Sequence, residues 1–137
     1  PYACGIFGRK LETVMLRIGF TLPIFAEQYI GDSTMSEQTA GGIAEFKRNL
    51  GAYISPRDIT QLFIRAVEAP NIEDEHGVPF VVAYGCSDNT RRFWSLETGR
   101  KYLDYQPQDD TEVKYAKEVA QLITGDGTNV RGGKVGI

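Results

Sequence analysis

SPRDITQLFIRAVEAP, residues 55–70, is the stretch that decides the fold. Ser55 is a favourable N-cap, Pro56 suits the first helical position, and Pro70 prevents the helix from continuing. Apolar residues recur between them at spacings of three and four, which predicts an amphipathic helix over 56–69 docked on a sheet. This apolar stripe consists of Ile59, Leu62, Phe63, Ala66 and Val67.

A strand is predicted on each side of this helix. LETVMLRIG (11–19) and VPFVVAYG (78–85) are apolar on both alternating faces, the pattern of strands that are covered on both sides. The order strand, helix, strand predicts an α/β fold with two parallel strands joined by a crossover. Two such strands do not make a stable sheet alone, because their outer edges stay unpaired. Either the chain holds further strands, or the rest of the sheet comes from elsewhere.

Three more helices are expected. MSEQTAGGIAEFKRNL (35–50) has apolar residues at helical spacing, and SLETGRKYL (95–103) offers a short helix. A final helix is predicted over 110–123, with Asp109 as its N-cap and Glu112 placed for a capping box.

The totals describe one ordinary globular domain over residues 1–137, with 42% hydrophobic and 24% charged residues. A net charge of −3 gives little attraction for nucleic acid or anionic lipid, so neither partner is expected. No apolar run reaches the length of a membrane span and the start lacks a signal peptide, so a cytoplasmic location is expected. Cys4, Cys86 and His76 do not form a metal-ligand set. Cys86 is expected to be a small buried residue and His76 a surface residue.

Known catalytic motifs are absent from the sequence: there is no glycine-rich dinucleotide loop, phosphate-binding P-loop or nucleophile elbow. The carboxylates of Asp58, Asp109 and Asp110 are better explained as helix caps than as an acid and a base. Tyr102 and Tyr105 are expected to form a half-buried aromatic surface.

Arg91 and Arg92 follow the second strand directly, at the edge where open α/β sheets bind their ligands. Arginine forks hold carboxylate or phosphate, and Phe93 or Trp94 would limit a pocket. Alternatively, one arginine is solvated and the other covers the aromatic rings with its stem. The residues alone favour neither of these two interpretations over the other.

Four segments carry a resemblance to a known family: LETVMLRIG, YISPRDITQLFIRAVEAP, FVVAYGCSDNTRRFWSLETGRKYLDYQPQDD and RGGK. In this order and approximate spacing they resemble the C-terminal half of the NAD-dependent epimerase/dehydratase proteins, the extended short-chain dehydrogenases. Within that family, the uronate dehydrogenase group is the most similar.

The resemblance implies the C-terminal portion of a Rossmann-type fold, which supplies the last strands and the substrate-binding part. Ile18, Gly19 and Phe20 match positions near the cofactor. The positions that match the substrate pocket are Asn89, Arg91, Arg92, Phe93 and Trp94.

The family's glycine-rich cofactor motif and its catalytic Tyr-x-x-x-Lys have no match in the chain, so no catalytic residue is assigned. The cofactor, NAD or NADP, is implied by resemblance only and is not expected to bind this chain alone. One hypothesis is the substrate-binding part of a sugar dehydrogenase or nucleotide-sugar epimerase or dehydratase, inactive by itself and acting on a sugar or sugar acid. The alternative is a non-catalytic interaction or small-ligand-binding module, either a homo-oligomer or a partner of a missing N-terminal half.

Overall fold

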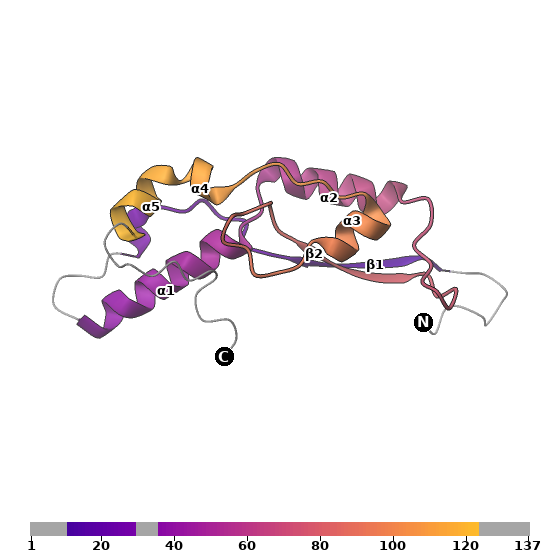
Figure 1. Cartoon of the computed structure of the whole chain (residues 1–137), viewed down its shortest axis with the longest axis horizontal. Helices are drawn as coiled ribbons and strands as arrows, with labels where there is room; N and C mark the ends of the chain where they lie inside the picture. The colour runs from indigo at the N-terminus through magenta and orange to yellow at the C-terminus, as the bar shows by residue number, and fades with distance from the viewer. Residues whose placement is uncertain (1–10, 30–35, 124–137) are drawn as a thin grey trace.

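The computed structural model describes residues 11–29 and 36–123, which form an α/β arrangement around two parallel strands (Figure 1). Strand β1 (Thr13–Ile18) pairs with β2 (Phe80–Gly85) along its whole length. Helix α2 (Pro56–Glu68) makes the crossover between them. The predicted α/β class with parallel strands is confirmed.

Five further elements complete the described chain. They are the 3-10 helix η1 (Ala26–Gln28) and the helices α1 (Ser36–Ala52), α3 (Glu97–Leu103), α4 (Thr111–Lys114) and α5 (Ala116–Ile123). The apolar spacing at 35–50 correctly predicted α1, which runs two residues further.

Helix α2 begins as its sequence predicts. Ser55 is the N-cap, and its Oγ accepts a hydrogen bond of 3.1 Å from the Asp58 backbone N–H. The predicted docking of the whole apolar stripe is wrong, however. Leu62 is fully buried, whereas Phe63 is 52% and Val67 is 86% exposed. Only the side of the helix that faces the sheet is covered by described residues.

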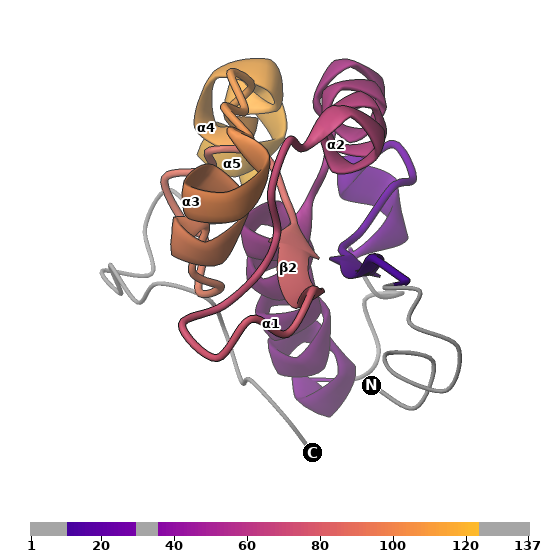
Figure 2. The same ribbon diagram turned by 90° about the vertical axis from the view of Figure 1, so that its right-hand side faces the viewer.

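The two faces of the sheet also differ in how far the described residues cover them. Figure 2 shows α2 over the sheet and α3 beside β2, on the side away from β1. Leu16 and its register partner Ala83 pack into the core under these helices. Met15, on the opposite face of β1, is 48% exposed. Among the described residues, Trp94 covers this face at Tyr84 of β2, and no strand pairs with the outer edge of β1. The expected burial of both faces is therefore wrong at β1.

A second core lies beyond the carboxyl ends of the strands, between α1 and α5 (Figure 1). Its buried members are Ile24, Tyr29, Phe46, Leu50, Tyr53 and Tyr115. A backbone bridge between Phe20 and Tyr53 connects it to the sheet. This second core fixes the region in which the loop after β2 must lie.

The predicted helix over 110–123 is divided in two. Tyr115 leaves the helical conformation, with φ −114° and ψ 34°, and its ring packs edge-on against Tyr53 at a centroid distance of 5.4 Å. The N-cap is Asp110, which accepts from the Glu112 backbone N–H, so the assignment of Asp109 to this position was wrong. Burial of the Tyr115 ring stabilises the break.

Three single-residue predictions are settled by burial. Cys86 is fully buried and the His76 side chain is 76% exposed, as expected. Tyr105 is also fully buried, where a half-buried ring was expected, and its hydroxyl donates a 2.9 Å hydrogen bond to the Cys86 carbonyl.

No helix in the two described ranges is long and apolar enough to cross a membrane.

Candidate functional site

The loop that follows β2, residues 86–95, is anchored to the second core by Asn89. This side chain is fully buried. Its amide nitrogen donates to the carbonyls of Tyr53 (2.8 Å) and Gly51 (3.3 Å), and its amide oxygen accepts from the Thr111 backbone N–H (3.2 Å). The hydrogen-bonding groups of Asn89 are therefore engaged in holding the loop, and its predicted contact with a substrate stays a prediction.

A second anchor holds the same loop from the side of α2. The fully buried carboxylate of Asp58 accepts a 2.6 Å hydrogen bond from Ser87 Oγ. It also accepts from the backbone N–H groups of Gln108 (3.0 Å) and Asp109 (3.1 Å). Asp58 is thus a tertiary connection, and its interpretation as a helix cap was wrong. Asp109 pairs with Arg57 at 2.6 Å and accepts from Ser55 Oγ.

Asp110 joins the loop to α4. Its carboxylate accepts hydrogen bonds from the backbone N–H groups of Thr90 and Glu112, both at 3.0 Å, and from the Thr90 hydroxyl. Partial burial alone would raise the pKa of Asp110, but these hydrogen bonds outweigh it and lower the pKa below its usual value. The carboxylate is therefore kept ionised as a cap.

The two adjacent arginines have different surroundings. Arg91 Nε is ion-paired with Glu112, and the Arg91 side chain is only 13% exposed. Arg92 is 36% exposed, and its Nη1 lies 2.8 Å from Asp88 Oδ1. Both arginines are ion-paired, but Arg91 is enclosed and Arg92 is more exposed, so Arg92 is the one of the pair that is accessible to a ligand.

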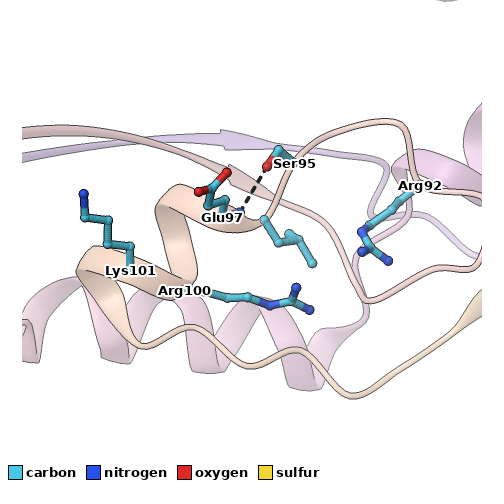
Figure 3. A pocket seen from close by; sticks show the side chains of 6 residues that line it. Arg92, Ser95, Glu97, Arg100 and Lys101 are labelled. Atoms are coloured by element: carbon cyan, nitrogen blue, oxygen red, sulfur yellow. Dashed lines mark hydrogen bonds between the residues drawn. The ribbon is translucent and has the colours of Figure 1, made fainter.

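Arg92 borders two cavities. One of about 280 Å³ is lined by Thr90, Arg92, Phe93, Trp94 and Ser95. The other, of about 540 Å³, is lined by Arg92, Ser95, Leu96, Glu97, Arg100 and Lys101 (Figure 3). The first cavity brings together three of the five residues predicted for a substrate pocket, and we treat it as the candidate site.

The aromatic wall of the candidate site is fixed by ring contacts. Trp94 stacks on Tyr84 with ring centroids 5.1 Å apart and planes 21° apart, and Phe93 meets Trp94 at 5.3 Å. Arg17 Nη1 donates to the Tyr84 hydroxyl at 3.3 Å. A Cβ added at Gly51 would lie 2.9 Å from the Phe93 ring, so that ring is held close to the chain. These contacts make a rigid apolar wall beside a cation.

The three residues that match the cofactor region contact the chain itself. Ile18 packs against the main core, and a Cβ at Gly19 would lie 1.8 Å from the Ala52 carbonyl oxygen. The Gly19 N–H donates to the Gly85 carbonyl at 2.8 Å and the Phe20 N–H to that of Ala52 at 2.9 Å. The backbone N–H groups of Gly19 and Phe20 are therefore not available to a cofactor. The predicted contact of the three residues with a cofactor stays a prediction.

The sequence did not indicate that Asp58 and Arg100 are parts of this region. Arg100 Nη2 lies 3.4 Å from the same Asp88 oxygen that Arg92 approaches. Arg100 lies in α3, eight residues after Arg92 in the sequence. The loop between them carries no periodic pattern from which their proximity could be predicted.

The comparisons with known proteins agree with this fold. No family model matches the chain. The uronate dehydrogenase of Pseudomonas syringae pv. tomato is 31% identical over 116 residues, which is 85% of this chain and 33% of that protein. The chain is homologous to part of the uronate dehydrogenases. A partial match of this kind fits a C-terminal portion of the family.

A second relative and two solved structures extend the comparison. The NAD-dependent glucose-6-phosphate dehydrogenase of Haloferax volcanii is 33% identical over 67 residues, 49% of this chain and 23% of that protein. A mutated uronate dehydrogenase has a TM-score of 0.51 at 26% identity, and covers 85% of this chain and 32% of that one. A glucuronic acid dehydrogenase from Chromohalobacter salexigens, 24% identical with the same TM-score, shows the fold over 85% of this chain and 33% of its own. The chain spans a third or less of the length of these relatives.

Proposed function

We propose that this chain forms the substrate-side portion of an NAD-dependent dehydrogenase of sugar acids, and that it is inactive by itself. The observation that carries the proposal is the Arg92 cavity at the carboxyl end of β2, together with similarity to uronate dehydrogenases over 85% of the chain. Ligands of open α/β sheets bind at this end of the strands.

The substrate class follows from the chemistry of the cavity. A uronate is a monosaccharide that carries one carboxylate. The Arg92 guanidinium presents a planar set of donors that matches a carboxylate. The sugar ring then lies against the wall formed by Phe93 and Trp94, in a cavity of about 280 Å³. Arg91 has a different part in this proposal: its ion pair with Glu112 holds the loop in place.

The requirement for another part of the protein follows from the backbone. The N–H groups of Gly19 and Phe20 already donate within the chain and are not free to hold a cofactor, which supports this requirement. NAD itself would supply hydride transfer when it is bound. The family's tyrosine acid–base would likewise come from a part of the protein other than the described residues.

A second candidate function is favoured by the apolar surface beside β1. A cavity of about 380 Å³ there is lined mainly by apolar residues of β1 and α2: Glu12, Val14, Leu16, Phe63, Ala66, Val67, Ala69 and Ile72. An apolar groove next to an unpaired strand edge is a surface for protein contact. Under this alternative the chain is an interaction module that has kept the family's fold without its chemistry.

Binding and turnover measured on the same preparation test the main proposal. We expect isothermal titration calorimetry to detect weak, saturable binding of glucuronate or galacturonate, and no binding of NAD. The substitution Arg92→Gln should abolish the uronate signal, whereas Arg57→Gln, which removes another arginine from an ion pair, should preserve it. NAD reduction by the 137-residue chain alone would contradict the inactivity, and a wild-type chain without uronate binding would contradict the substrate class.

A further inference from the structure

The larger cavity beside Arg92 has no role in the function proposed above. It has a volume of about 540 Å³ and lies between the loop that ends at Ser95 and helix α3. Figure 3 shows the side chains of Arg92 and Arg100 reaching toward each other from opposite sides, while Lys101 lies at the far end of the cavity. The buried Leu96 side chain contributes an apolar part of the lining.

The lining of this cavity is positively charged. Arg92, Arg100 and Lys101 are opposed by Glu97 at the lining and by Asp88 beside it, which leaves one positive charge in excess. A neighbouring cavity of about 370 Å³, on the side of α3 that faces α2, is different: its cations Arg65 and Lys101 are balanced there by Glu68 and Asp104. The excess of positive charge is therefore a property of the first cavity and not of the whole helix surface.

Asp88 brings the two guanidinium groups together without consuming their hydrogen bonds. Its Oδ1 lies 2.8 Å from Arg92 Nη1 and 3.4 Å from Arg100 Nη2. This oxygen is buried, yet neither guanidinium offers it an N–H group in hydrogen-bonding geometry. A buried acceptor of this kind normally has a hydrogen-bond partner. The charge of Asp88 thus attracts both arginines, although neither of them forms a hydrogen bond with this oxygen.

We propose that this cavity is a phosphoryl-binding site, in which the phosphate group of a small metabolite lies between Arg92 and Arg100. A phosphate carries up to two negative charges and three acceptor oxygens, so it can accept bidentate hydrogen bonds from two arginines at once. The cavity is larger than a phosphate ion needs, and the rest of the ligand extends over Leu96 toward Lys101. Arg92 borders both cavities, but Arg100 and Lys101 lie outside the candidate sugar cavity, so variants of Arg100 test this inference separately from the dehydrogenase proposal.

Calorimetric titrations at constant ionic strength test the site, with inorganic phosphate, glucose 6-phosphate and glucuronate as separate probes and chloride as the reference anion. Fluorescence of Trp94, the single tryptophan, provides a second readout two residues from Arg92. Saturable binding of inorganic phosphate is expected. Tighter binding of glucose 6-phosphate would identify a phosphorylated metabolite as the ligand, and equal binding would identify the free ion. No saturable binding of inorganic phosphate or of glucose 6-phosphate would overturn the phosphoryl assignment.

Matched variants locate the binding. Arg100→Gln should weaken phosphate binding at least about tenfold, since hydrogen bonds to charged groups are lost. Arg65→Gln is the control: Arg65 is 43% exposed and ion-paired at 3.4 Å, and Arg100 is 45% exposed with an ion pair of the same length. Glu97→Gln, which removes the opposing charge, should tighten binding about two- to threefold. Equal losses in the Arg100 and Arg65 variants, or no response to Glu97→Gln, would refute the site.

Discussion

Ser87 Oγ donates a 2.6 Å hydrogen bond to Asp58 Oδ2, and both side chains are fully buried. The two residues come from different elements, because Asp58 lies in the first turn of α2 and Ser87 follows β2. The same carboxylate accepts backbone N–H groups of Gln108 and Asp109. The Asp58 side chain thus connects the crossover helix to the loop that carries Arg92 and to the segment that leads into α4.

Replacing this carboxylate is expected to destabilise the whole region. Asp58→Asn would put an amide NH₂ where N–H and O–H donors converge, and would leave buried donors without acceptors. We expect a loss of about 3 kcal/mol in the free energy of unfolding, measured by urea denaturation. Asp104→Asn is the control, because Asp104 is exposed and its left-handed conformation (φ 52°) suits asparagine. A loss in D58N no larger than in D104N would contradict the anchoring role.

Asn89 is expected to be required for stability whether or not a ligand is present. Asn89→Ala leaves the Thr111 N–H without the Asn89 acceptor, and leaves the Tyr53 carbonyl with the Ser87 N–H as its remaining donor. A loss of about 2–3 kcal/mol should appear in the urea midpoint of the ligand-free chain. Asn71→Ala, which removes an exposed asparagine that caps a single backbone N–H, should cost well under half of that. Wild-type stability in N89A would favour a direct ligand contact in place of the structural one.

Gly19 should not tolerate a side chain. A Cβ there would lie 1.8 Å from the Ala52 carbonyl oxygen, and this contact is to backbone that cannot rotate away. Gly19→Ala is expected to cost more than about 3 kcal/mol and to lower the thermal midpoint by more than about 10 °C. Gly99→Ala is the matched case, since its nearest neighbour would be at 3.4 Å and the residue is helical, so stability should stay equal or rise slightly. Similar melting temperatures for G19A and wild type would show that the two segments separate easily.

Cys86 makes stability depend on pH in the alkaline range. Burial raises the pKa of its thiol to about 11 from 9.0. Because the fold keeps the thiol neutral, the unfolded chain loses its proton first as the pH rises above 9, and stability falls between pH 9 and 11 by up to about 3 kcal/mol. Cys86→Ala in a Cys4→Ser background should remove this part of the slope, while buried tyrosines leave a remainder. An unchanged slope in the variant would show that the thiol does not contribute.

The apolar groove beside β1 should govern association and leave folding unaffected. Val67 is 86% exposed, so Val67→Glu removes no described packing and should change the free energy of unfolding by less than about 0.5 kcal/mol. If the groove is an interaction surface, sedimentation velocity should show an oligomer for wild type and a monomer for V67E. Val113→Glu, at a 79% exposed site on α4, is the control and should keep the wild-type state. A monomeric wild-type chain would contradict the homo-oligomer form of the alternative.

Local chemistry explains why part of the fold could be predicted. The N-cap at Ser55, the prolines around α2 and the two apolar runs act over a few residues, so they identified the elements and their parallel pairing. The limit of such patterns is visible at Tyr115. The sequence around Tyr115 continues the pattern of one helix, but α4 ends at this residue, where the Tyr115 ring packs against Tyr53.

The sequence by itself determined the α/β class, the crossover helix and the position of two arginines after a strand. Only the tertiary structure decided that Arg91 is neutralised by Glu112 while Arg92 borders two cavities and meets Arg100 beside Asp88. The reason is physical: a guanidinium has the same charge and reach in either setting, and its availability depends on which carboxylate the fold places beside it. Glu112, the partner of Arg91, lies 21 residues away in the chain, beyond the range of any helical or strand period.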